Sequence, residues 1–135
     1  MKLLITEVYL IVRDVMSSFD TDLIKQCIVV AVHNGISLSD NWVIKRMEGI
    51  VNKCPKELSV AMIKENMDLG NRWNNRESLL NRKDWLMLYK VMVDAQTKIM
   101  GILFGLNRQY VHHPAFKWQK HTLKSMIITP ENICI

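Results

Sequence analysis

The sequence predicts an all-α, mainly helical fold, a bundle of about five helices with a short N-terminal strand or extended arm. Apolar residues recur at helical spacing over most of the chain, and capping residues or prolines stand at the boundaries of these segments. The 135 residues, 49% of them hydrophobic and 23% charged, suit one folded domain. We therefore expect a strand or arm over residues 1–14 and a helical domain over residues 15–135.

The N-terminal segment from Leu3 to Val12 is apolar at nearly every position and rich in β-branched residues, which predicts a buried strand. A single strand has no partner within its own chain. We expect it to join the sheet of another chain, to lie as an arm over the helices, or to be the last strand of a sheet whose other strands are missing. A homodimer formed through residues 3–12 is one such assembly.

Two helices are expected before the first proline. Helix 20–33 follows the capping side chains of Ser17, Ser18 and Asp20, and the step Asn34-Gly35 ends it. A second helix begins after Ser39 or Asp40 and closes at Cys54-Pro55.

Three helices are expected after Pro55, and the first of them runs to about Leu80. Asp84 caps the most strongly periodic helix, which reaches about Tyr110. Gly101 and Gly105 lie inside that helix, where each costs about 1 kcal/mol relative to alanine, so they predict a close helix contact. The last helix is expected from Pro114 to Ser125.

The positive charge is concentrated near the C-terminus. The net charge is +5, and no Asp or Glu lies between Asp94 and Glu131. That stretch contains five basic residues (Lys98, Arg108, Lys117, Lys120 and Lys124) and the histidines His112, His113 and His121. The asymmetry favours an anionic partner such as a nucleotide, a nucleic acid or a phosphorylated ligand, and a solvated basic face explains it equally well.

Cysteine spacing and hydropathy indicate a reduced, cytoplasmic protein. Cys27, Cys54 and Cys134 are odd in number and far apart, unlike the ligands of a zinc site or a redox pair. The N-terminus makes a poor signal peptide. A membrane span needs about 18 uninterrupted apolar residues, and no stretch of the chain approaches that length, so we expect no membrane partner.

No complete catalytic site or metal site is expected. Asp20 and Asp22 form a carboxylate pair of the kind that holds divalent cations, but no glycine precedes Gly35 to form a phosphate-binding loop, which favours helix capping. His112, His113 and His121 have no Cys, Asp or Glu nearby in sequence. Nucleophile elbows, P-loops, dinucleotide fingerprints and the His-Glu-x-x-His motif are all absent.

One polar, basic and aromatic cluster remains as a candidate ligand-binding site. Its members are Asn107, Arg108, Tyr110, His112, His113, Lys117 and Trp118. Arginine and lysine can bind phosphate, and aromatic rings offer a face to a base or sugar. The competing interpretation is structural, with Asn107 and Arg108 bonded to the helix end and the interhelix loop while Tyr110 and Trp118 fill the core.

The chain reads Leu103-Phe104-Gly105-Leu106-Asn107-Arg108-Gln109-Tyr110, followed by His-Pro and Lys117-Trp118. This segment resembles the C-terminal helical region of nucleotidyltransferase-like proteins, which are related to aminoglycoside nucleotidyltransferases. The looser likeness spans about Val8 to Lys124. It implies an acceptor-binding helical domain in which Asn107, Arg108, Tyr110, Lys117 and Trp118 organise a wall facing a substrate or a catalytic partner.

The family's catalytic domain carries a Gly-Ser followed by an Asp-x-Asp, and this chain contains no Gly-Ser. The resemblance therefore implies a non-catalytic binding domain, with residues 3–12 as the last strand of the missing sheet. Magnesium and a nucleoside triphosphate enter only if a separate catalytic chain supplies their site. The alternatives are nucleotidyl transfer together with a separate catalytic chain, a basic helical module that binds nucleic acid, and a dimerisation module.

Overall fold

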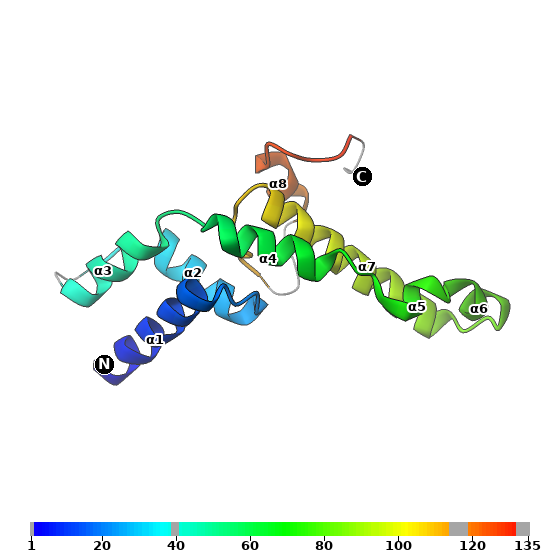
Figure 1. The fold of residues 1–135 in the computed structure, drawn as a ribbon, viewed down its shortest axis with the longest axis horizontal. Helices are drawn as coiled ribbons and strands as arrows, with labels where there is room; N and C mark the ends of the chain where they lie inside the picture. The colour runs from blue at the N-terminus through cyan, green and yellow to red at the C-terminus, as the bar shows by residue number, and fades with distance from the viewer. Residues whose placement is uncertain (1, 39–40, 114–118, 132–135) are drawn as a thin grey trace.

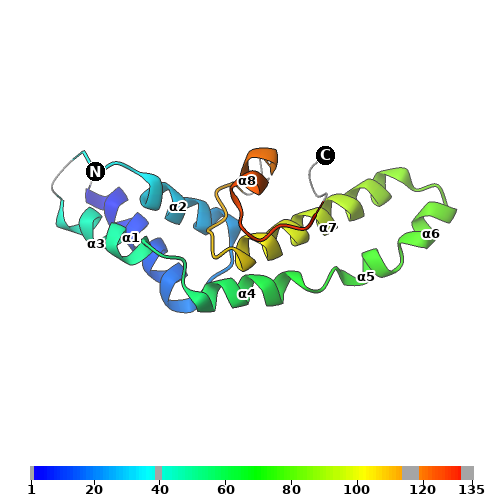
Figure 2. The ribbon, with the colours of Figure 1, turned by 90° about the horizontal axis from the view of Figure 1, so that it is seen from above.

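The structure is a computed structural model that describes residues 2–38, 41–113 and 119–131. Within these ranges the chain forms eight helices and no strand, which confirms the all-α prediction. Helices α1, α2 and α3 gather at one end, α4 and α7 run side by side through the middle, and α5 and α6 extend the other end (Figure 1). Figure 2 shows α7 running back along α4, α5 and α6. The molecule is therefore elongated.

The N-terminal segment is a helix, α1 (Lys2–Ser18), so the predicted strand or arm was wrong. Val12 and Val15 are fully buried, and the partly buried residues on the same side continue their spacing of three and four: Ile5, Val8, Tyr9 and Met16. A short apolar run fits a strand or a buried helix equally well, and the continuation through Val15 and Met16 is what distinguishes the two. Residues 3–12 present no strand edge to another chain.

Helices α2 (Leu23–Asn34) and α3 (Trp42–Val51) pack against α1. The predicted caps for α2 were misplaced: Asp22 caps it, accepting a hydrogen bond of 2.9 Å from the Lys25 amide. Asp20 accepts from the Asp22 amide and from the Lys25 ammonium group, whose hydrogen bond lowers the pKa of Asp20. Asn41 caps α3, while the predicted caps Ser39 and Asp40 lie outside the described residues. The carboxylate pair at 20 and 22 thus begins a helix, as the capping interpretation requires.

The helix predicted from Pro55 to Leu80 is divided into α4 (Lys56–Asn66), α5 (Gly70–Asn74) and α6 (Arg76–Asn81). The first break is a turn in which the Asp68 carboxylate accepts from the Gly70 amide at 2.8 Å, and Gly70 adopts φ +81°. The second break falls at Asn75, whose φ of −97° and ψ of 16° lie outside the helical range. Local polar and glycine residues therefore override the apolar periodicity.

Helix α7 (Trp85–Leu106) is the longest element, and Asp84 caps it as predicted. It ends at Leu106, short of the predicted Tyr110. Gly101 and Gly105 face α4, where an added Cβ would lie 2.6 Å from the Asn66 side chain and 2.9 Å from the Ser59 carbonyl oxygen, respectively. The predicted close helix contact is confirmed, and it brings α4 and α7 together along their length.

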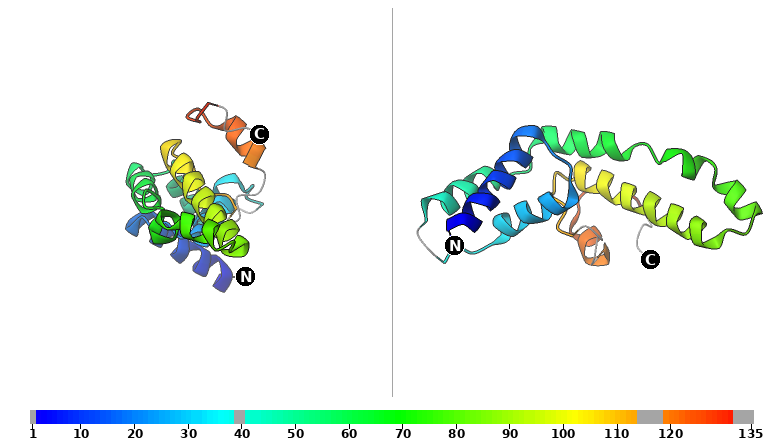
Figure 3. Two further views of the ribbon diagram at one scale, coloured as in Figure 1. Left: turned by 90° about the vertical axis from the view of Figure 1, so that its right-hand side faces the viewer. Right: turned by 90° about the horizontal axis from the view of Figure 1, so that it is seen from below.

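Helix α8 (Gln119–Ser125) is the described part of the predicted last helix, since residues 114–118 lie outside the described ranges. Its Leu123, together with Met126, joins a core cluster that runs from Val12 and Val15 through Leu58 and Met62 to Phe104. Figure 3 shows α8 lying to one side of the α4–α7 pair. None of the described helices is both long and apolar enough to cross a membrane.

Candidate functional site

The C-terminal end of α7 turns sharply at Arg108. The Arg108 amide donates to the Gly105 carbonyl and the Gln109 amide to the Phe104 carbonyl, both at 3.0 Å, which is the hydrogen-bond pattern of a Schellman motif. This motif requires a left-handed residue, and Arg108 supplies it with φ +51°. The turn ends the helix and directs residues 109–111 across the N-terminal helices.

Tyr110 anchors this crossing segment to the α3–α4 loop. Its side chain is 7% exposed, and its hydroxyl donates toward the carbonyls of Lys53 at 3.0 Å and Val51 at 3.2 Å. Burial raises the pKa of Tyr110 far above its ordinary value, and the neighbouring Cys54 adds to this effect. Tyr110 is therefore a protonated structural donor, in agreement with the structural interpretation of the cluster.

Gln26 makes a second anchor from α2. It has no exposed surface, its side-chain oxygen accepts from the Val111 amide at 2.9 Å, and its side-chain nitrogen donates to the Thr21 carbonyl at 3.2 Å. A buried amide side chain with both ends bonded fixes the direction of the backbone it contacts. Together Gln26 and Tyr110 hold residues 110 and 111 between α2 and the α3–α4 loop.

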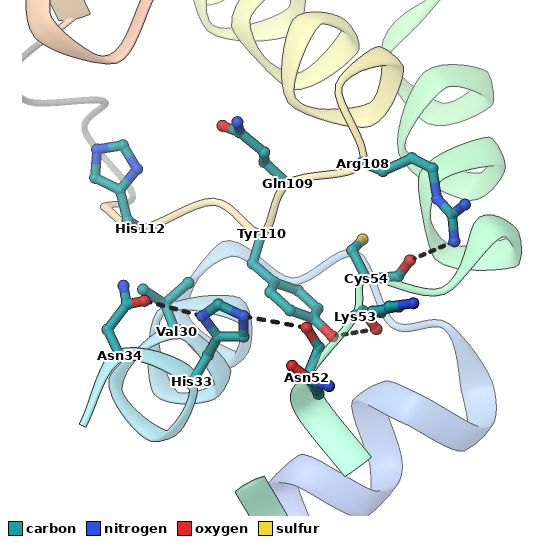
Figure 4. A pocket seen from close by; sticks show the side chains of 10 residues that line it. All are labelled: Val30, His33, Asn34, Asn52, Lys53, Cys54, Arg108, Gln109, Tyr110 and His112. Carbon is teal, nitrogen blue, oxygen red and sulfur yellow. Dashed lines mark hydrogen bonds between the residues drawn. The ribbon is translucent and has the colours of Figure 1, made fainter. Parts of the chain in front are cut away.

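A cavity of about 660 Å³ opens beside this crossing segment (Figure 4). We call it the Tyr110 cavity, and its lining residues are Val30, His33, Asn34, Asn52, Lys53, Cys54, Arg108, Gln109, Tyr110 and His112. They come from the end of α2, the α3–α4 loop and the turn after α7. Two are permanent cations, two are imidazoles, three are amides, and no lining residue is acidic. The cavity is therefore suited to an anion.

His33 connects two walls of the Tyr110 cavity. Its Nε2 donates to the Asn52 carbonyl at 3.3 Å, and its Nδ1 lies 2.9 Å from the Asn34 side-chain oxygen. The imidazole also meets the Tyr110 ring edge-on, with 6.0 Å between ring centroids. The last turn of α2 is thereby joined to the loop that follows α3, as the dashed lines in Figure 4 show.

Arg108 reaches from the end of α7 to the same loop. Its Nη2 donates to the Cys54 carbonyl at 2.9 Å, which uses one of the five N–H donors of the guanidinium group. The Cys54 thiol is buried, burial raises its pKa, and its sulfur lies 3.7 Å from the Ser59 hydroxyl. Cys54 is thus an unreactive part of the wall, while Arg108 brings a cation to its rim.

The other predicted site residues are divided between structural roles and undescribed positions. Asn107 donates to the Leu103 and Ile128 carbonyls at 2.8 Å and accepts from the Ile128 amide, so it ties the C-terminal segment to α7. His112 lines the cavity with Nε2 3.2 Å from the Thr122 hydroxyl, whereas His113 is half-buried outside the lining. Lys117 and Trp118 lie outside the described residues.

Most of the lining contributed by the N-terminal helices was not predicted from the sequence, including His33, Asn34, Asn52 and Lys53. Asn34 and Cys54 were read only as parts of helix ends. The sequence offered one indication of these lining residues: polar helix ends at 33–34 and 52–54 follow apolar helical segments. Pairing them with residues 108–112 required the three-dimensional path of the chain.

In the part of the chain that the structure describes, no three His, Cys, Asp or Glu side chains lie close enough together to hold a metal ion. Asp22 caps α2, and Asp20 accepts from the Asp22 amide and from the Lys25 ammonium group. The basic residues of the C-terminal third are dispersed: Lys98 contacts the Asp68 carbonyl, Arg108 lies at the cavity, and Lys120 and Lys124 are exposed on α8.

Comparison with known proteins gives one family. No curated protein and no solved structure matches the chain. The family model described as "Domain of unknown function (DUF4037)" matches residues 22–119, which is well over half of the chain and runs from the cap of α2 to the start of α8. The matched region contains every described residue that lines the Tyr110 cavity. The chain therefore belongs to the DUF4037 family, a domain of unknown function.

Proposed function

We propose that this chain is a non-catalytic helical binding domain that holds a small phosphate-bearing anion, such as a nucleotide, in the Tyr110 cavity. The observation that carries the proposal is the composition of the lining: Lys53 and Arg108 stand among imidazoles and amides, with no carboxylate. The volume of about 660 Å³ falls within the usual range of small-molecule sites. A phosphate group fits this chemistry better than a cation does.

Each basic group has a distinct part in the proposed binding. The Arg108 guanidinium is held at the rim by one hydrogen bond to the Cys54 carbonyl, so its other N–H donors are left for an incoming phosphate. Lys53 is exposed and adds a mobile point charge from the opposite loop. The amides of Asn52 and Gln109 supply neutral donors, and Tyr110, hydrogen-bonded to the Lys53 carbonyl, holds the crossing segment beside them.

The backbone at Arg108 supports a role for its side chain. Glycine is the usual residue at the left-handed position of a Schellman motif, and another residue there costs roughly 1–2 kcal/mol. Arg108 occupies that position and directs its side chain to the cavity rim. An arginine at a strained position beside a cavity is consistent with a binding function.

The resemblance to nucleotidyltransferase-like proteins adds a context to this proposal. The segment that carries it, with Asn107, Arg108 and Tyr110, is the turn that forms one wall of the Tyr110 cavity. We infer an acceptor-binding role in which this wall faces a substrate or a separate catalytic chain. Magnesium and a nucleoside triphosphate would then be held by that other chain.

Calorimetric titration of the full chain with ADP, ATP and inorganic pyrophosphate tests the proposal. We expect saturable binding that weakens about tenfold or more in Lys53→Ala and in Arg108→Gly, since a hydrogen bond to a charged group contributes about 1.5–3 kcal/mol. Arg108→Gly removes the fork while relieving the left-handed strain, so the variant remains folded.

Lys124→Ala, an exposed cation on α8, is the matched control and should bind as the wild type does. Failure of all three compounds to bind at millimolar concentration would refute the proposal. If Lys124→Ala weakens binding as much as Lys53→Ala, and the chain binds nucleic acid with a steep salt dependence, the basic nucleic-acid module is the better description.

A further inference from the structure

Helix α7 carries apolar side chains on two adjoining sides of its N-terminal half. Val91 and Ala95 are buried on the side that faces α4, α5 and α6. Beside them six large apolar side chains are 44% to 85% exposed: Trp85, Leu86, Tyr89, Met92, Val93 and Ile99. Spacings of three, four and seven residues place them in one stripe, which we call the Tyr89 stripe. A helix that is apolar on both sides is normally covered on both sides.

The arm formed by α5, α6 and α7 leaves this stripe bare among the described elements. In Figure 3 (right) α5 and α6 lie along one side of α7, and no other described helix lies along the rest of its first half. The side chains beside the stripe satisfy one another, because the Lys90 ammonium group lies 3.1 Å from the Asp94 carboxylate. The stripe itself contains no charged residue. An apolar partner therefore suits it better than a nucleic acid or an anionic membrane surface.

We propose that the Tyr89 stripe is a homodimer interface in which two copies of α7 pack antiparallel about a two-fold axis near Tyr89. Most of the stripe is symmetric about Tyr89, because Trp85 and Val93 lie four residues before and after it and Leu86 and Met92 lie three residues before and after it. A two-fold axis there sets Trp85 of one copy opposite Val93 of the other and Tyr89 opposite its counterpart. A straight apolar stripe of this kind is complementary to itself, as an isologous contact requires.

The exposed area also suits a second copy. A large side chain presents on the order of 200 Å² when fully exposed, so the exposed fractions of the six residues give roughly 700 Å² per copy. A standard stable interface buries about 800 Å² on each partner. The Tyr89 stripe and its immediate rim therefore supply the area that a dimer needs.

Sedimentation velocity of the full chain over a range of concentrations tests this interface. We expect a dimer in the wild type and a dissociation constant raised about 30-fold or more in Tyr89→Glu, the effect of losing a central aromatic anchor. The matched control is Ile24→Glu on α2, because Ile24 and Tyr89 are both 66% exposed. Ile24→Glu should leave the dimer unchanged. Circular dichroism on both variants checks that each keeps its helical content.

Three results would overturn the dimer proposal: a wild-type chain that stays monomeric at hundreds of micromolar, a dimer that Tyr89→Glu does not weaken, or a dimer that Ile24→Glu weakens equally. The test is independent of ligand binding. The Tyr110 cavity contains none of the stripe residues, so failure of one proposal leaves the other standing.

Discussion

The hydroxyl of Tyr110 must be protonated to donate the hydrogen bonds that hold the segment after α7 against the α3–α4 loop. Because burial raises the pKa of Tyr110, its contribution to stability is fully present below about pH 10, the ordinary tyrosine value, and is lost as the pH rises beyond it. We expect the free energy of unfolding to fall above pH 10, and to fall less steeply in Tyr110→Phe. Urea unfolding at a series of pH values measures both slopes.

The phenylalanine variant also loses the hydrogen bonds to Lys53 and Val51, so it should be less stable than the wild type by about 1 kcal/mol at neutral pH. Equal slopes above pH 10 in the two proteins would contradict the assignment of this pH dependence to Tyr110.

At the scale of single elements, the contact between α4 and α7 depends on glycine at position 105. A Cβ there would lie 2.9 Å from the Ser59 carbonyl oxygen and 2.8 Å from Ile63 Cγ1, and the backbone atom cannot move aside. Overpacking costs about 1–3 kcal/mol, and alanine returns about 1 kcal/mol of helix propensity. We expect Gly105→Ala to lower the free energy of unfolding by about 1 kcal/mol in urea titrations.

Gly101→Ala is the matched control on the same helix face. Its added Cβ meets only the side chain of Asn66, which can rotate away at the expense of its hydrogen bond to the Met62 carbonyl. The loss should therefore be smaller than at position 105. If Gly101→Ala lowers the free energy of unfolding more than Gly105→Ala does, then α4 and α7 move apart at position 105 to accommodate the added Cβ.

Features of the helices that depend on nearby residues could be predicted from the sequence, and those that depend on packing could not. The glycine contact, the Asp84 cap and the all-α class followed from local spacing and capping chemistry, which act within a few residues. Residues 3–12 were assigned to a strand because an apolar run of that length suits either structure until packing decides. The segment after Pro55 was predicted as one helix because its periodicity outweighed Gly70 and Asn75.

The candidate site divides in the same way. Arg108, Tyr110 and His112 are clustered in the sequence and were found there. His33 and Lys53 approach them only because Gln26 and Tyr110 hold the crossing segment against distant elements. Long-range hydrogen bonds of this kind leave no local pattern in the amino-acid sequence.

At the scale of the whole molecule, Gln26 links the N-terminal helices to the segment that leaves α7. In Gln26→Met the side-chain volume is kept, but the buried Val111 amide and the Thr21 carbonyl lose their partners. Leaving buried polar groups unpaired costs about 1–3 kcal/mol each, so we expect the free energy of unfolding to fall by at least that amount. Chemical denaturation followed by circular dichroism measures it.

Gln109→Met changes a half-buried glutamine at the cavity and serves as the control. It should be nearly as stable as the wild type. Similar losses of unfolding free energy in the two variants would show that the hydrogen bond between Gln26 and Val111 does not stabilise the fold more than the contacts of Gln109 do.

The elongated arrangement of the helices has a hydrodynamic consequence. The solvent-accessible surface is 9602 Å², whereas a folded monomer of 15.8 kDa ordinarily has about 7300 Å². A rod drags more solvent than a sphere of equal mass, so this chain should leave a gel-filtration column early, at the volume of a heavier globule. Elution volume alone would thus mimic self-association, and only a mass measurement free of shape, such as light scattering, separates a long monomer from a pair.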